Sequence, residues 1–351
     1  AWHRRIALAE ALGAKVISDL KTATSFPTDH PLHAGAPGYF LAPEAVDALR
    51  AADVLLSLDW IDLAGTLKTA LGRDGPAQVR VIQSSIDHHL HGGWSKDHQA
   101  LPPIDCHLAS EPDTAVADLL DALGLPDLGD RPLDNFPTAP IQLGVDPDCP
   151  MDVAGFAAGL GEGLAGETVT FTKLPLGWDG PLWHFRHPLD YLGGDGGGGL
   201  GSGPGIAVGA ALALKDTGRL PAAVLGDGDF LMAASALWTA AHYRIPLLVV
   251  VCNNGAFYND EVHQERMARM RSRPVENKWI GQRISDPDVD IVGLARSFGA
   301  DAIGPAATGA ELAEALRLAV ATVRAGGVAV VEARVLPGYS KAMATSLNRK
   351  P

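Results

Sequence analysis

Glycine and oxygen-bearing side chains follow two strand-like segments in the second half of this chain. A Gly-Asp-Gly motif at 226–228 comes directly after the apolar segment 222–225, and an Asn-Asn pair at 253–254 comes directly after the apolar segment 247–252. A helix expected over 233–243 connects the segments, so they form parallel strands whose carboxyl ends meet at one edge of a sheet. A carboxylate, an amide oxygen and a nearby carbonyl are hard-oxygen ligands that suit Mg²⁺ when it also binds phosphate groups. The spacing therefore predicts a site for Mg²⁺ and a phosphorylated ligand.

The Gly-Asp-Gly motif also favours an anion through its backbone. Gly226 and Gly228 carry no Cβ, so the chain can approach the anion closely, and the amides that open the following helix add donors and a favourable dipole. Asp229 departs from this pattern, because a carboxylate directly after the motif would face the anion and repel it. We expect its side chain to turn away and cap the following helix. Direct contact between that side chain and the anion is the alternative.

These residues carry a resemblance to a known family. A Gly-Asp-Gly motif, the 24 residues 229–252 and an Asn-Asn pair resemble the signature of thiamine-diphosphate enzymes. The flanking segments 196–214 (GGGGLGSGPGIAVGAALAL) and 236–258 (ALWTAAHYRIPLLVVVCNNGAFY) resemble the benzoylformate decarboxylase and acetolactate synthase branch. The segment 26–35 (FPTDHPLHAG) is similar to the central domain of those enzymes.

The resemblance implies a role for each matching position. Asp227 and the Asn254 side chain are implied Mg²⁺ ligands, with the Ala256 carbonyl as the third. Leu200 is the bulky apolar residue that holds the cofactor bent, and Gly198 offers the carbonyl that receives the pyrimidine amino group. The residues expected to contact thiamine diphosphate are Gly198, Gly199, Leu200, Gly226, Asp227, Gly228, Asp229, Asn254, Ala256, Phe257 and Tyr258.

The resemblance also implies the chemistry. Such enzymes act on a 2-keto acid or a related carbonyl compound as C–C lyases or carboligases, with the bound cofactor as electron sink. The alternatives are a non-catalytic cofactor-binding or regulatory homologue and one subunit of a split enzyme. Flavin is disfavoured, because flavin-binding acetolactate synthases tend to carry an Arg-Phe-Asp-Asp type stretch where this chain has SLDWIDLAG at 57–65.

Hydrophobic patterning predicts α/β architecture in two doubly wound parallel-sheet domains. We expect a Rossmann-like central domain over 1–145 and a diphosphate- and Mg²⁺-binding domain over 146–351, joined by the proline-rich stretch 125–150. The expected helices are 1–12, 43–51, 113–123, 151–164, 206–214 and 233–243, with a final helix before the last strand. The expected strands are 16–17, 54–58, 79–82, 168–171, 222–225, 247–252 and 328–335.

We expect a further domain of this site to lie outside residues 1–351. Residues 1–12 look like a helix already in progress, so we expect further chain upstream. In the enzymes that the sequence resembles, a glutamate on a pyrimidine-binding domain activates the cofactor. We expect that domain to come from upstream sequence or from another chain, and we assign no catalytic residue within 1–351. A homodimer or homotetramer is expected.

The composition of the chain limits the classes of binding partner and the cellular compartment that we expect. Lys and Arg number 28 against 41 Asp and Glu, and the formal net charge of −13 disfavours nucleic acid and acidic membranes. Apolar runs such as 246–252 are far shorter than the ~20 residues of a membrane helix. Three widely spaced cysteines form neither a zinc pattern nor a disulfide framework, which favours the cytoplasm.

Three other patterns receive weaker interpretations. Gly196, Gly198 and Gly201 have dinucleotide spacing but follow no clear strand, so a nicotinamide site is disfavoured. Histidines within 88–98 lack metal-ligand spacing and are expected in an exposed loop. Arginines within 266–273 are expected either on a solvated helix face or in a lid over the site, and both interpretations stay open.

Overall fold

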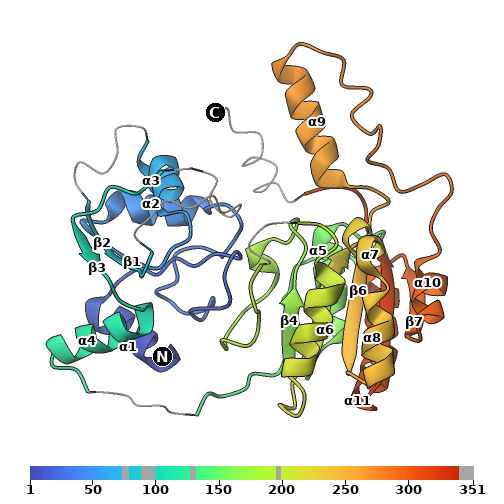
Figure 1. The fold of residues 1–351 in the computed structure, drawn as a ribbon, viewed down its shortest axis with the longest axis horizontal. Coiled ribbons are helices and arrows are strands. Elements are labelled where there is room, and N and C mark those ends of the chain that lie inside the picture. Colours follow the sequence, from blue (N-terminus) through green and yellow to red (C-terminus); the bar gives the residue numbers. More distant parts are fainter. Residues whose placement is uncertain (73–78, 88–97, 99, 127–131, 195–198, 340–351) are drawn as a thin grey trace. The chain divides into compact units, whose positions relative to one another are not determined.

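The computed structural model describes residues 1–72, 79–87, 98, 100–126, 132–194 and 199–339 (Figure 1). The chain divides into two units. The N-terminal unit contains residues 1–134 with the short segments 184–188 and 193–198, and the C-terminal unit contains 135–183, 189–192 and 199–351. The predicted domain boundary near Val145 lies about ten residues beyond the first of these divisions.

The N-terminal unit is built on a parallel three-stranded sheet in the order β1-β2-β3. Residue pairing runs from Leu56 through Ile82 to Cys106. The strands are β1 (Val54–Leu58), β2 (Arg80–Ser84) and β3 (Cys106–Leu108), and the helices are α1 (Trp2–Leu12), α2 (Pro43–Ala51), α3 (Leu63–Leu71) and α4 (Pro112–Ala122).

Helices cover both faces of this sheet. Leu55 packs with apolar residues of α2 and α3, whereas Leu56 and Leu58 pack with apolar residues of α1 and α4. Successive strand residues point to opposite faces, so a strand buried on both sides reads as a continuous apolar run. This is the doubly wound arrangement predicted for the first half of the chain.

The C-terminal unit is built on a parallel five-stranded sheet in the order β4-β5-β6-β8-β7. Its strands are β4 (Val169–Lys173), β5 (Leu220–Gly226), β6 (Leu247–Asn253), β7 (Asp301–Ala306) and β8 (Val328–Arg334). Its helices are α5 (Val153–Gly163), α6 (Gly203–Ala213), α7 (Asp227–Ala233), α8 (Ala236–Tyr243), α9 (Tyr258–Met270), α10 (Ile291–Ser297) and α11 (Gly309–Arg324), and η1 (Gly180–Leu182) is a short 3₁₀ turn.

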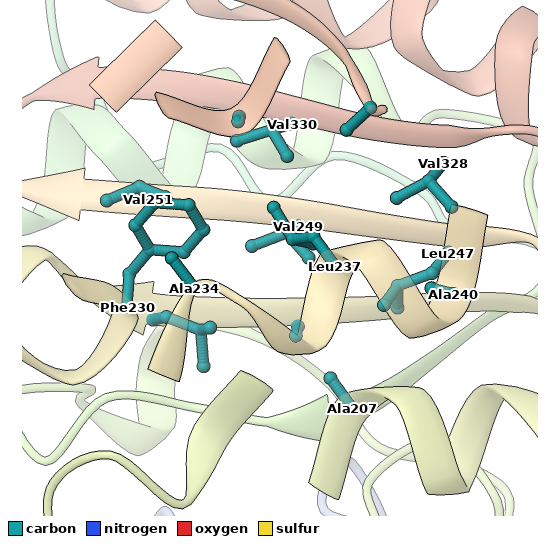
Figure 2. Close-up of a cluster of buried hydrophobic side chains, with 14 of the residues drawn as sticks. Ala207, Phe230, Ala234, Leu237, Ala240, Leu247, Val249, Val251, Val328 and Val330 are labelled. Atoms are coloured by element: carbon teal, nitrogen blue, oxygen red, sulfur yellow. The ribbon is translucent and has the colours of Figure 1, made fainter. Parts of the chain in front are cut away.

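The main core of this unit lies on one face of the sheet (Figure 2). Val249 and Val251 of β6 meet Phe230 of α7 and Leu237 of α8, and α6 and α10 add further side chains to the same cluster. Helices α5 and α11 pack against each other, and α11 also contacts β7 and β8. Because β5 and β6 are central and apolar along their length, their carboxyl ends have fixed positions relative to each other.

Most predicted elements occur within a few residues of their expected bounds. Val16 forms only an isolated bridge with His33, so the expected strand over 16–17 is wrong. The helix expected over 233–243 is split into α7, which begins at Asp227, and α8. Helices α3, α9 and α10 and strands β3 and β7 lie outside the predicted segments. Among the described helices, none is long and apolar enough to cross a membrane.

Candidate cofactor and metal site

The two predicted motifs lie side by side in the C-terminal unit. Gly226, the last residue of β5, pairs with Cys252 of β6, so the Gly-Asp-Gly motif and the Asn-Asn pair leave the same edge of the sheet. Asp227 is the first residue of α7, and its carboxyl is nearly inaccessible to solvent. The crossover formed by α7 and α8 therefore places the motifs together, as the sequence predicts.

Two of the three predicted metal ligands, the side chains of Asp227 and Asn254, meet at the backbone of the third, Ala256. The Ala256 amide donates to Asp227 Oδ2 at 3.2 Å and to Asn254 Oδ1 at 3.1 Å. Since both side-chain oxygens reach one amide, they lie close to each other and to the backbone of Ala256. A carboxylate, an amide oxygen and a backbone carbonyl form a donor set that fits Mg²⁺. Clusters of three or more His, Cys, Asp or Glu placed for a metal are absent from the described residues.

Burial and hydrogen bonding act on Asp227 in opposite directions. Burial raises the pKa of its carboxyl above the ordinary value, while backbone amides, including those of Gly228, Gly255 and Ala256, oppose that shift. The Gly228 amide donates to Asp227 Oδ1 at 3.0 Å. A nearby cation favours the charged form of a carboxylate and so offsets the cost of burying it. The role of Asp227 as a cation ligand is compatible with this environment and stays a prediction.

Gly228 is required by the shape of the site. A Cβ at this position would overlap the ring of Phe257, so the backbone at 228 and that aromatic side chain are in direct contact. Tyr258 follows at the start of α9, and its ring packs edge-on against Tyr339, with ring centroids 5.1 Å apart. The Tyr339 hydroxyl donates to Asn259 Oδ1 at 3.0 Å. Phe257 and Tyr258 therefore directly follow the predicted metal ligands, and their contact with the diphosphate stays a prediction.

Sequence reasoning missed a buried carboxylate next to the Asn-Asn pair. Glu332 of β8 is 2% exposed, and its Oε1 accepts from Asn253 Nδ2 at 2.8 Å. Asn253 Oδ1 in turn accepts from the Gly255 amide at 3.0 Å. Arg334 Nε lies 3.0 Å from the same Glu332 oxygen. Glu332 therefore fixes the first Asn of the pair, and with it the turn that carries Asn254 and Ala256.

The glycine-rich loop before α6 is described from Gly199 onward. Gly199, Leu200 and Gly201 lead into α6, and the Leu200 side chain is half exposed. Gly198, to which the resemblance gives a carbonyl contact with the cofactor, lies outside the described residues. Gly196 of the disfavoured nicotinamide motif also lies outside them.

The structure corrects the role expected for Asp229. Gly226 is the N-cap residue of α7, and Asp229 lies inside the first turn of that helix, so its side chain does not cap it. Asp229 Oδ1 instead accepts from the Gly201 and Gly203 amides at 2.7 and 3.2 Å. The expectation was wrong because α7 begins at Asp227, which directs the third residue toward α6.

Two candidate patterns remain, the arginines within 266–273 and the histidines within 88–98. Arg266 and Arg269 lie on α9, of which only Glu261 is buried, and Arg269 pairs with Glu265 one turn away. Figure 1 shows α9 running away from the edge of the sheet at which β6 ends. The lid interpretation of this segment stays a prediction. Of the histidines in 88–98, only His98 is among the described residues.

Comparison with protein families matches both halves of the chain. Residues 1–97 match the central domain of thiamine pyrophosphate enzymes, and residues 177–333 match their C-terminal TPP binding domain. The benzoylformate decarboxylase of Pseudomonas aeruginosa is 33% identical over 135 residues, 36% of this chain and 22% of that protein. The acetolactate synthase of Mycobacterium avium is 30% identical over 267 residues, 71% of this chain and 40% of that protein. The chain thus spans well under half of these relatives.

Solved structures share the fold. A thiamine diphosphate-dependent 4-hydroxybenzoylformate decarboxylase from Rhodococcus jostii matches with a TM-score of 0.67 and 22% identity, over 96% of this chain and 59% of that one. The benzoylformate decarboxylase from Polynucleobacter necessarius matches with the same TM-score and 21% identity, over 97% of this chain and 60% of that one.

Proposed function

We propose that this chain, which belongs to the thiamine pyrophosphate enzyme family, binds thiamine diphosphate with Mg²⁺ and acts on a 2-keto acid or a related carbonyl compound. The reaction is C–C bond cleavage or carboligation. Relatives named as benzoylformate decarboxylase and acetolactate synthase support this reaction class. When bound, the cofactor supplies an electron sink for bonds next to a carbonyl group.

The observation that carries the proposal is the convergence of Asp227, Asn254 and Ala256 at one edge of the sheet. In this proposal the three residues hold Mg²⁺, which anchors the diphosphate. One pair of unit charges at ~4 Å contributes about 4 kcal/mol at an effective dielectric near 20, before desolvation. Anchoring by a divalent ion on a multiply charged diphosphate is therefore a major contribution to cofactor affinity.

Other residues of the same edge shape the cofactor pocket in this proposal. Gly228 and the first amides of α7 face the diphosphate, because a helix N-terminus binds anions through free amides and its dipole. Leu200 supports the bent cofactor, and Phe257 and Tyr258 line the diphosphate. Gly199 and Gly226 contact the cofactor through the backbone.

We also propose a second domain for the site, an oligomeric state and a location for the enzyme. A pyrimidine-binding domain, carried upstream or by another chain, provides the glutamate that acts on the pyrimidine ring. The enzyme works as a homodimer or homotetramer in the cytoplasm, and flavin has no role in it.

A substrate panel tests the proposal. The complete protein, supplied with thiamine diphosphate and Mg²⁺, is assayed for CO₂ release and for carboligation products across aromatic and aliphatic 2-keto acids. We expect turnover with at least one compound, abolished when the metal is chelated. Tight cofactor binding without turnover on any compound would instead support a cofactor-binding homologue or one subunit of a split enzyme.

A further inference from the structure

The buried negative charge of Asp229 is not balanced by any residue of the proposed cofactor site. Its carboxyl is 5% exposed and lies two residues after Asp227, beside a pocket proposed to hold an anionic diphosphate. An unpaired buried carboxylate is costly in itself and repels a nearby anion. A residue in this position therefore needs a partner of opposite charge.

Lys173 is that partner. It is the last residue of β4, and its Nζ lies 3.5 Å from Asp229 Oδ2, with the lysine side chain 15% exposed. The two side chains come from different elements, and both contact the loop 199–203. Their charges cancel, so the pair adds no net charge next to the cofactor pocket.

The pair also binds the loop at several points. Asp229 Oδ1 accepts from the Gly201 and Gly203 amides. Lys173 Nζ donates to Ser202 Oγ at 2.9 Å, and the Ser202 hydroxyl donates to the Gly199 carbonyl oxygen at 2.9 Å. The hydrogen bonds thus reach four of the five loop residues and leave Leu200 as the residue whose side chain projects.

The N-terminus of α6 depends on the same carboxylate. Ser202 is the N-cap residue of α6 but makes no side-chain cap hydrogen bond, and Gly203 is the first helical residue. Asp229 supplies the missing acceptor from α7. A carboxylate at a helix N-terminus is favoured both by the free amides and by the helix dipole. A Cβ at position 203 would overlap Asp229 Oδ2, so Gly203 permits this close approach.

We propose that Lys173 and Asp229 form a latch that fixes the loop 199–203 and thereby positions Leu200 for the cofactor. Asp229 is a positioning residue, and Lys173 makes its charge compatible with a neighbouring diphosphate. The contribution to cofactor binding rests on the proposed function. The contribution to loop order does not, because every contact of the latch lies within the protein.

The two carboxyl oxygens have separate roles, which makes the latch testable by substitution. Both amide hydrogen bonds go to Oδ1, and the lysine faces Oδ2. Asp229→Asn keeps an acceptor for the two amides and removes the ion pair. Asp229→Ala removes both. Lys173→Met removes the cation and leaves a buried carboxylate, whereas the double substitution Lys173→Met with Asp229→Asn removes both charges together.

The first experiment measures amide hydrogen exchange of the peptide 199–213 in the complete protein without cofactor. We expect exchange at Gly201 and Gly203 about tenfold faster in Asp229→Ala, equivalent to about 1.4 kcal/mol, and near the wild-type rate in Asp229→Asn. The matched control is Asp152→Ala, which removes a carboxylate that accepts from the Gly155 amide at 2.8 Å at the start of α5. This control leaves exchange in 199–213 unchanged. Unchanged exchange in folded Asp229→Ala overturns the latch.

The second experiment measures the Kd for thiamine diphosphate at saturating Mg²⁺ in the same variants. We expect Asp229→Ala and Lys173→Met to bind about tenfold more weakly, and the double substitution to recover affinity relative to Lys173→Met. A Kd for Asp229→Ala equal to that of the wild type overturns the positioning of Leu200. A wild type that binds no cofactor, together with faster loop exchange in Asp229→Ala, refutes the proposed function and leaves the latch supported.

Discussion

Replacing Glu332 tests whether the site depends on a residue that makes no predicted contact with metal or cofactor. In Glu332→Ala, Asn253 Nδ2 loses the acceptor that lies 2.8 Å away in a buried position. A buried donor without an acceptor costs ~1–3 kcal/mol, so we expect the free energy of unfolding to fall by about 2 kcal/mol. If Asn253 then rotates, the Gly255 amide loses its own acceptor at 3.0 Å.

The second loss reaches the metal ligands. A neutral hydrogen bond contributes a net ~0.5–1.5 kcal/mol, which corresponds to about two- to tenfold in an equilibrium constant. We therefore expect the affinity for Mg²⁺ and thiamine diphosphate to fall by that factor, because the turn that carries Asn254 and Ala256 is less well ordered. Glu332→Gln keeps an acceptor for Asn253 and should lose less of both quantities.

The assay combines urea unfolding with calorimetric titration of thiamine diphosphate at saturating Mg²⁺. The control is Glu167→Ala, which removes the ion-pair partner of Arg324. Glu167 lies just before β4, at the edge of the sheet opposite to the site. We expect this control to bind the cofactor like the wild type. Glu332→Ala that loses stability but binds the cofactor with unchanged affinity would refute the reasoning that Glu332 orders the ligand turn.

Three further predictions concern single contacts. Gly228→Ala should lower the free energy of unfolding by ~1–3 kcal/mol, because the added Cβ overlaps the Phe257 ring. Gly226→Ala is the control, since a Cβ there has no atom within 4 Å, and it should unfold at nearly the wild-type urea concentration. Equal losses of stability in the two variants would contradict the close contact at Gly228. Arg219→Met should cost ~3–5 kcal/mol in urea unfolding because it removes the guanidinium that pairs with the buried Asp190 carboxylate. A loss below about 1 kcal/mol would contradict a stabilising role of this ion pair. Burial lowers the pKa of His33 below its ordinary value. The unfolded chain therefore binds more protons than the folded chain, and stability falls as pH drops below about 6.5. Urea unfolding at two pH values should show this loss of stability in the wild type and a smaller loss in His33→Gln.

The fold was predictable wherever apolar patterning and chain order agree. Strands β5 and β6 are buried along nearly their whole length, so their sequences are apolar runs that predict buried strands. Helix α9 was anticipated only as one of two interpretations of its arginines, because it packs few side chains and shows almost no apolar periodicity. Strand β7 was missed because Gly304 and Pro305 interrupt its apolar pattern. Sequence periodicity reports burial, so elements with little burial give little signal.

The site was predictable only for residues within the two motifs. Asp227 and Asn254 follow consecutive strands, and the rule that carboxyl ends of parallel strands meet is enough to bring them together. Glu332 and Lys173 belong to other strands of the sheet, and their contacts depend on strand order, which local patterning does not determine. Asp229 was assigned the wrong role because α7 begins at Asp227, which directs the Asp229 carboxyl toward the amides before α6.

The most direct test of the proposed site is the dependence of cofactor binding on Asp227 and on the metal. Thiamine diphosphate is titrated into the complete protein by calorimetry, with Mg²⁺ and with a chelator, for the wild type and for Asp227→Ala, and Asp152→Ala serves as the folding control. We predict tight binding only for the wild type and Asp152→Ala with Mg²⁺ present, and at least a hundredfold weaker binding, about 2.7 kcal/mol or more, in Asp227→Ala. Equal affinity in folded Asp227→Ala, or equal wild-type affinity with and without the chelator, would contradict the assignment of Asp227 as a ligand of the metal that anchors the cofactor.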